Sequence, residues 1–197
     1  MIKKNNNLLS LYIHWPYCES KCPYCDFNSH VNENVEIEQW IKSYTNQLYK
    51  MKEELLKHNV DFDKLNAIFF GGGTPSLMPL KIIDSILKTS LDIFGFEKNI
   101  EISLEANPSS YEKDKFQDLK RIGINRLSIG VQSLNDKNLK FLGRLHNSFN
   151  AKTAVEHATK TFNNVSVDLI YAFHGQKIVN WTNELKIFLE NNNLQHL

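Results

Sequence analysis

Three cysteines stand out as the residues most able to carry chemistry, because all of them lie within eight positions. Cys18, Cys22 and Cys25 form a C-x3-C-x2-C pattern, and no other position of the 197 holds a cysteine. Three clustered thiolates can bind three irons of a cubane iron–sulfur cluster and leave the fourth iron open to a small molecule. The pattern therefore predicts a 4Fe–4S cluster with one ligand position free.

Two other uses of clustered cysteines compete with this interpretation. A disulfide framework favours an even number of cysteines in a small secreted domain, and the chain matches neither condition. A structural zinc site is a more serious alternative, since His14 or His30 could supply the fourth ligand. Zinc ligands usually come as two short pairs separated by a longer spacer, whereas these three cysteines share one loop. The zinc site is therefore the less favoured alternative.

Size and charge set broad limits on the function. With 197 residues, 42% of them hydrophobic, the chain can bury one good core, and we expect a single domain over 1–197. The formal net charge of +1 gives no electrostatic attraction to nucleic acid or to an anionic membrane. The start, 1–7, is polar and has no signal-peptide pattern, and no apolar run is long enough to span a membrane. With reduced cysteines, these features favour a cytoplasmic protein.

Strand and helix patterns alternate along the whole chain, which predicts an α/β fold with a parallel sheet. Apolar periodicity predicts strands over 8–14, 65–70, 100–106, 126–130 and 165–171, and helices over 37–56, 80–94, 111–122, 151–162 and 178–189. Residues 194–197 could open a sixth strand. A partial (β/α) barrel fits better than an open Rossmann sheet, because no G-x-G-x-x-G follows the first strand. Five βα units do not close a barrel, so we expect an incomplete domain.

Polar and glycine residues follow several of the predicted strands, at the end where barrel enzymes gather their functional groups. A glycine run, 71–73, precedes Thr74, and its exposed backbone could approach a ligand, although a plain tight turn explains it as well. Arg144 has a planar guanidinium suited to a carboxylate ligand. The remaining polar residues at these strand ends are Glu105, Gln132 and Asp168.

The cysteine loop, 11–29, resembles the cluster loop of radical S-adenosylmethionine (radical SAM) proteins. More narrowly, the chain resembles the anaerobic coproporphyrinogen III oxidase family over about 8–190. Four further segments match that family in order and spacing: Phe70-Gly-Gly-Gly-Thr-Pro-Ser76, Glu105-Ala-Asn-Pro108, Leu127-Ser-Ile-Gly-Val-Gln-Ser133 and Leu142-Gly-Arg-Leu-His146. Within the family, Cys25-Asp-Phe-Asn-Ser29 is similar to the HemW branch of heme chaperones. The oxidase has a fourth cysteine where this chain has Phe27.

The resemblance implies a 4Fe–4S cluster on Cys18, Cys22 and Cys25, with S-adenosylmethionine at the open iron and heme as cargo. An electron donor for the cluster and a heme-acceptor protein are also implied. Matching positions suggest that nine residues contact S-adenosylmethionine: Tyr12, Tyr24, Gly72, Gly73, Thr74, Glu105, Gln132, Arg144 and Asp168.

Two departures from the family pattern bear on this expectation. The family usually has Leu-Pro-Gly-Gln where this chain has Phe173-His-Gly-Gln176, and His174 is more easily read as drift than as a heme ligand. Family members also continue beyond this chain with a C-terminal region that helps to bind heme. A heme chaperone is therefore the first functional hypothesis. The alternatives are an oxygen-independent coproporphyrinogen III oxidase of porphyrin biosynthesis, and a non-functional fragment.

Overall fold

A five-stranded parallel sheet forms the centre of this computed structural model, which describes residues 8–31, 34–62, 64–108, 114–191 and 194–197. The strands follow the order β1-β4-β5-β6-β7, and every neighbouring pair is parallel. Their bounds are Leu9–Trp15 (β1), Leu65–Gly72 (β4), Phe96–Ala106 (β5), Arg126–Gln132 (β6) and Asn164–Leu169 (β7). Spatial order therefore repeats chain order, as right-handed crossovers in a barrel-type sheet require.

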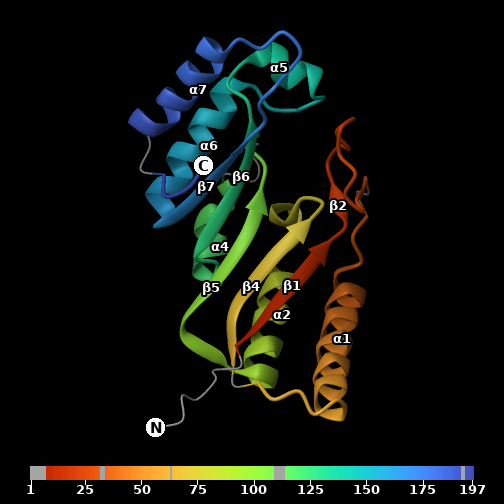
Figure 1. Cartoon of the computed structure of the whole chain (residues 1–197). Helices are drawn as coiled ribbons and strands as arrows, with labels where there is room; N and C mark the ends of the chain where they lie inside the picture. Colours follow the sequence, from red (N-terminus) through yellow and green to blue (C-terminus); the bar gives the residue numbers. More distant parts are fainter. Residues whose placement is uncertain (1–7, 32–33, 63, 109–113, 192–193) are drawn as a thin grey trace.

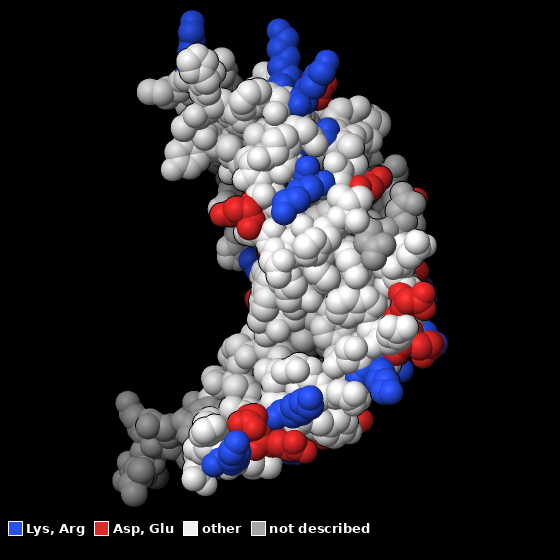
Figure 2. All heavy atoms as spheres, turned by 90° about the vertical axis from the view of Figure 1, so that its right-hand side faces the viewer, with Lys and Arg blue, Asp and Glu red and all other residues white. Residues whose placement is uncertain are grey.

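Helices cover one face of this sheet and leave the other face hollow. In Figure 1, α2 and α4 lie behind the strands, and the quarter-turn view in Figure 2 has a crescent outline. Acidic and basic side chains alternate over the surface visible there, in keeping with the near-neutral net charge. The helices are Ile37–Lys57 (α1), Leu80–Phe94 (α2), Phe116–Arg121 (α4), Asp136–Phe141 (α5), Ser148–Thr161 (α6) and Ile178–Asn191 (α7), with a 3-10 turn at Pro75–Leu77.

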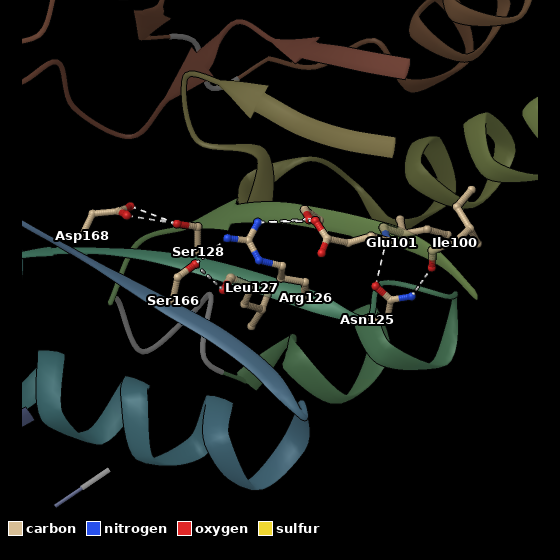
Figure 3. Close-up of polar contacts among 10 residues, drawn as sticks. Ile100, Glu101, Asn125, Arg126, Leu127, Ser128, Ser166 and Asp168 are labelled. Atoms are coloured by element: carbon tan, nitrogen blue, oxygen red, sulfur yellow. Dashed lines mark hydrogen bonds and ion pairs between the residues drawn. The ribbon is translucent and has the colours of Figure 1, made fainter. Parts of the chain in front are cut away.

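The period-two alternation of the strands separates an apolar face from a polar one. In β6, Leu127, Ile129 and Val131 are fully buried in the core under the helices. Arg126 and Ser128 alternate with them and point to the hollow face, where they make the polar contacts drawn in Figure 3. The hollow face is consequently able to bind polar ligands while the other face holds the sheet to its helices.

The predicted α/β alternation with a parallel sheet is confirmed, and the helix over 80–94 has the bounds predicted. Five predicted starts differ from the structure, two of them by one residue only (β1 and β7), and α6 begins at Ser148 instead of 151. β5 begins at Phe96, four residues before the prediction, and pairs with the start of β4 through Leu65. Of the predicted helix over 111–122, the structure has α4 at Phe116–Arg121; residues 111–113 lie outside the described residues, as does the polar start, 1–7.

One helix was missed, and one predicted strand is present only as a bridge. The six-residue α5 is too short to show a periodic apolar face, although Asn135 caps it by accepting a hydrogen bond from the N–H of Lys137. His196 forms a parallel bridge with Ser166 of β7, where the sixth strand was expected. Among the helices that the structure describes, we find none long and apolar enough to cross a membrane.

Candidate functional site

The cysteines lie on a loop that leaves the carboxyl end of β1 and is fastened at both ends. Two short parallel strands, Tyr17–Cys18 (β2) and His30–Val31 (β3), pair at its base. Within the loop, the N–H of Cys25 donates to the carbonyl of Cys22 at 3.0 Å. All three thiols are free and half-buried. The loop therefore presents its sulfur atoms from a defined backbone rather than from an open tail.

A cavity of about 330 Å³ joins this loop to the carboxyl ends of the strands. Its lining includes all three cysteines and seven of the nine residues predicted to contact S-adenosylmethionine: Tyr24, Gly73, Thr74, Glu105, Gln132, Arg144 and Asp168. Residues up to 150 positions apart in the chain thus meet around one space (Cys18 and Asp168). The predicted convergence of strand ends is present in the structure.

The other two predicted residues, Tyr12 and Gly72, lie just outside the lining of this cavity. Gly72 donates its backbone N–H to the Glu105 carboxylate, so it acts on the cavity through that side chain. The Tyr12 hydroxyl lies 3.3 Å from Nδ1 of His14, and its ring stacks on Phe69 with centroids 6.1 Å apart. Tyr12 is 57% exposed and lies beside the cavity. Its contact with S-adenosylmethionine therefore stays a prediction.

Two of the three sulfur atoms receive hydrogen bonds from side chains that line the cavity. The hydroxyl of Thr74 donates to Sγ of Cys18 at 3.4 Å, and Nη1 of Arg144 donates to Sγ of Cys22 at 3.6 Å. Such donors stabilise a thiolate, which is the form that binds iron. The phenol of Tyr24 lies between Cys22 and Arg144, and burial raises its pKa.

Asn107 forms hydrogen bonds with both of these donors. The sequence motif Glu105-Ala-Asn-Pro108 contains this residue, but the sequence predicted no role for it. Its amide Nδ2 donates to Thr74 Oγ1 at 3.1 Å, and its Oδ1 accepts from Arg144 Nη2 at 2.5 Å. The same guanidinium donates to the carbonyl of Gly130 at 2.8 Å. One amide therefore sets the orientation of both groups that contact cysteine sulfur, although an Asn before Pro in sequence signals only a turn.

The glycine run is more than a tight turn. A Cβ on Gly73 would lie 2.7 Å from the carbonyl oxygen of Tyr17 and 3.1 Å from Sγ of Cys18. Gly72 has φ +114°, a backbone conformation that side chains disfavour. Backbone here approaches the first cysteine so closely that a side chain at Gly73 would force the cysteine loop away.

Two carboxylates line the cavity, of which Glu105 is half-buried and Asp168 is more exposed. Burial raises the pKa of Glu105, and the negative charge of Asp168 adds to the effect. Burial also raises the pKa of Asp168, while Ser128, which donates to both of its oxygens at 3.1 Å, and Arg126 oppose the rise. Figure 3 shows Arg126, Ser128 and Asp168 side by side above the sheet. Neighbouring acids with raised pKa values are typical of binding sites.

The sulfur arrangement bears on which metal group fits. Across the part of the chain that the structure describes, no three His, Cys, Asp or Glu side chains are placed to hold one ion. His14, the nearer candidate for a zinc ligand, has its Nε2 3.0 Å from the carbonyl of Asn28. A cubane cluster places each thiolate on a different iron, so its ligands stand further apart than those of one zinc ion. The residues fit a cluster better than zinc.

Comparison with known proteins agrees with this chemistry. The family model described as the radical SAM superfamily matches residues 12–182. The heme chaperone HemW of Haemophilus influenzae is 41% identical over 186 residues, which are 92% of this chain and 48% of that protein. The radical S-adenosyl methionine domain-containing protein 1, mitochondrial, of Danio rerio is 38% identical, with 91% of this chain and 40% of that protein covered. The chain thus spans two fifths to one half of these relatives.

A solved structure supports the fold. The coproporphyrinogen III oxidase HemN of Escherichia coli, described as a radical SAM enzyme, superposes with a TM-score of 0.80 at 27% identity, covering 97% of this chain and 44% of that one. The predicted partial-barrel architecture is therefore confirmed, and the match to the superfamily extends over most of the chain. This protein belongs to the radical SAM superfamily.

Proposed function

We propose that this chain is the cluster-binding part of a heme chaperone, which binds heme and passes it to an acceptor protein. The observation that carries the proposal is its 37–41% identity to the HemW heme chaperones of Escherichia coli and Haemophilus influenzae across more than nine tenths of the chain. Because the chain spans less than half of those proteins, their activity is a proposal for this one. Phe27, where the oxidase family has a fourth cysteine, lines the cavity and favours the chaperone.

The residues present suit the cofactors that the superfamily implies. Cys18, Cys22 and Cys25 would hold a 4Fe–4S cluster, and S-adenosylmethionine would bind its open iron. Bound together, the two cofactors supply one-electron chemistry. Glu105 and Asp168 can accept hydrogen bonds from ribose hydroxyls or an amine, and Arg144, which contacts Cys22 Sγ, can also pair with a carboxylate.

The remaining cavity residues would orient the cofactor and limit the entry of water. Tyr24, which is 44% exposed, lies on the cysteine loop beside Arg144, where its ring can pack over a ligand. Free thiols of this kind require a reducing compartment, so we also propose a cytoplasmic location. The cluster would need an electron donor, which is a second partner besides the heme acceptor.

An oxygen-independent coproporphyrinogen III oxidase is the second candidate, favoured by the similarity to HemN. Both candidates bind a tetrapyrrole, but only the oxidase removes carboxyl groups from it. The two functions are therefore separated by whether the bound tetrapyrrole changes chemically.

Anaerobic reconstitution with iron and sulfide tests the proposal. We expect an EPR signal of a reduced 4Fe–4S cluster that changes on adding S-adenosylmethionine, and a Soret shift when heme is titrated. Incubation with coproporphyrinogen III, S-adenosylmethionine and a reductant should leave the substrate unchanged, whereas formation of protoporphyrinogen would favour the oxidase. A melting curve on the same sample addresses the third hypothesis, because a non-functional fragment should neither melt cooperatively nor assemble a cluster.

A further inference from the structure

We propose that Glu184 of α7 is a positioning residue, which holds Gln132 in the cavity that would bind S-adenosylmethionine. The inference rests on the proposed function, since it assumes that Gln132 contacts this cofactor. Glu184 is only 9% exposed, and its Oε1 accepts hydrogen bonds from two neighbouring groups in the turn after β6. Ser133 donates its hydroxyl at 2.8 Å, and Leu134 donates its backbone N–H.

Gln132 has a backbone conformation that needs such support. Its φ is +69°, in the left-handed region that side chains other than glycine rarely adopt. The next residue, Ser133, turns back at once, donating its N–H to the carbonyl of Val131 at 2.9 Å. The carbonyl of Gln132 accepts from the N–H of Ile170 at 2.9 Å. β7 therefore fixes Gln132 on one side, and Glu184 fixes the turn that follows it.

The position of the Gln132 side chain matters because it lies close to the network around the cysteines, over the same glycine. Space above Gly130 is occupied by the Gln132 amide, since a Cβ built on this glycine would lie 2.9 Å from Nε2. Nη2 of Arg144 and Oδ1 of Asn107 lie 3.7 Å from the same point. Through Arg144, this group of side chains reaches Sγ of Cys22. A small rotation of the turn would therefore move the amide within the cavity.

Docking of α7 does not explain why a carboxylate is buried here. Phe188, one turn further along the helix, is 1% exposed and anchors α7 in the hydrophobic core. Among the ion pairs of the described residues, none provides Glu184 with a cation. A buried, unpaired carboxylate is an expensive way to hold a helix that an apolar side chain could hold alone. The hydrogen bonds that its Oε1 accepts come from the turn, which is what a positioning role requires.

The test measures S-adenosylmethionine affinity from the EPR change of the reconstituted cluster. Glu184→Leu keeps an apolar contact for α7 but removes the acceptor, and we expect about tenfold weaker binding with unchanged iron content. Glu184→Gln retains an acceptor oxygen and should restore most of the affinity. Gln132→Ala should weaken binding by a similar factor. In the double variant Gln132→Ala/Glu184→Leu the affinity should equal that of Gln132→Ala alone, because Glu184 acts through Gln132.

A structural control separates positioning from a general loss of stability. Asn147 accepts from the N–H of Asn150 in the capping box that begins α6, so Asn147→Ala should lower the melting temperature and leave the affinity intact. If Glu184→Leu does not fold, Ser133→Ala removes the hydroxyl that donates to Glu184, together with its contacts to Asn135 and Asn138, and should show the same non-additivity with Gln132→Ala.

Four outcomes would each count against the inference about Glu184, the contact of Gln132 or the proposed function. Unchanged affinity in Glu184→Leu, or effects of the two substitutions that multiply in the double variant, would overturn the inference about Glu184. Unchanged affinity in Gln132→Ala would instead refute the contact assumed for Gln132, and with it the inference. A wild-type chain that assembles no cluster would contradict the proposed function itself.

Discussion

Two hollows of similar size lie at opposite ends of the sheet and differ in their chemistry. The cavity at the carboxyl ends of the strands has a volume of about 330 Å³ and is lined by thiols, carboxylates, amides and a guanidinium. A second hollow, of about 400 Å³, lies where β1 and β4 begin, against the end of α1. Its lining is mostly aliphatic and includes Leu9, Leu11, Leu55, Leu65 and Phe94.

The difference teaches that size does not identify the functional site of this fold. Strand direction does, because every parallel strand delivers its carboxyl end, and the loop that follows it, to the same edge of the sheet. Cys18, Glu105 and Gln132 reach one cavity from three such ends. The apolar hollow contains no group that would bind iron or accept a hydrogen bond strongly, apart from Glu54 and His58, which pair with each other at 3.4 Å.

The largest expected effect is the difference between one substitution in the polar cavity and one in the apolar hollow. Cys22→Ala removes a cluster ligand, so we expect reconstituted protein to lose its 4Fe–4S EPR signal and most of its bound iron. Leu55→Ala in the apolar hollow should keep both, while lowering the free energy of unfolding by roughly 1–2 kcal/mol because the side chain is only partly buried. Loss of the cluster in Leu55→Ala, with a normal melting curve, would break the comparison.

A second expected effect concerns pH and a buried histidine that contacts β6 beside the polar cavity. Burial, with a smaller contribution from Arg144, lowers the pKa of His146 from 6.5 to about 4, and its Nε2 lies 3.1 Å from the carbonyl of Val131. Below about pH 6.5, His146 takes up a proton in the unfolded chain but stays neutral in the native protein. The stability that His146 contributes is therefore complete above pH 6.5 and is lost as the pH falls toward 4, by at most about 3 kcal/mol.

Denaturant unfolding between pH 7 and pH 5 checks this effect. His146→Gln can still donate to Val131 but cannot titrate, so its free energy of unfolding should fall less than that of the wild type. His58→Gln at the rim of the apolar hollow is the matched control, and its profile should follow the wild type, because its exposed ion pair contributes little. Parallel curves for the wild type and His146→Gln would show that His146 does not govern the pH response.

The contrast between the hollows also shows what could be predicted from sequence. Period-two alternation was sufficient for β6, and the apolar face of Leu80–Phe94 was sufficient for α2, because both patterns report burial directly. The cavity residues followed from strand ends and from the family resemblance. Asn107 and Glu184 were missed, since their roles depend on partners 33 to 50 positions away. No local pattern distinguishes a Glu that faces a distant turn from one on a solvated helix surface.

The smallest effect sharpens the comparison most, because it should have opposite signs in the two hollows. Glu105 has a raised pKa, so the native state binds its proton more tightly than the unfolded state does. Its contribution to stability is thus present below pH 4.5 and is lost as the pH rises through the folded pKa. Glu105→Gln should therefore raise the melting temperature at pH 7, by roughly 2–4 °C for each kcal/mol gained, while weakening S-adenosylmethionine binding.

Calorimetry at two pH values distinguishes this reason from a better-packed side chain. Near pH 4 the wild-type Glu105 carries its proton and resembles Gln, so the difference in melting temperature should shrink toward zero. A gain that persists at pH 4 would point to packing instead. Leu55→Ala lowers stability at both pH values, because the apolar hollow contributes burial rather than charge. If Glu105→Gln raises the melting temperature at pH 7 and Leu55→Ala lowers it, then a charged group in the polar cavity reduces the stability of the protein. That is expected where charged groups are kept for binding.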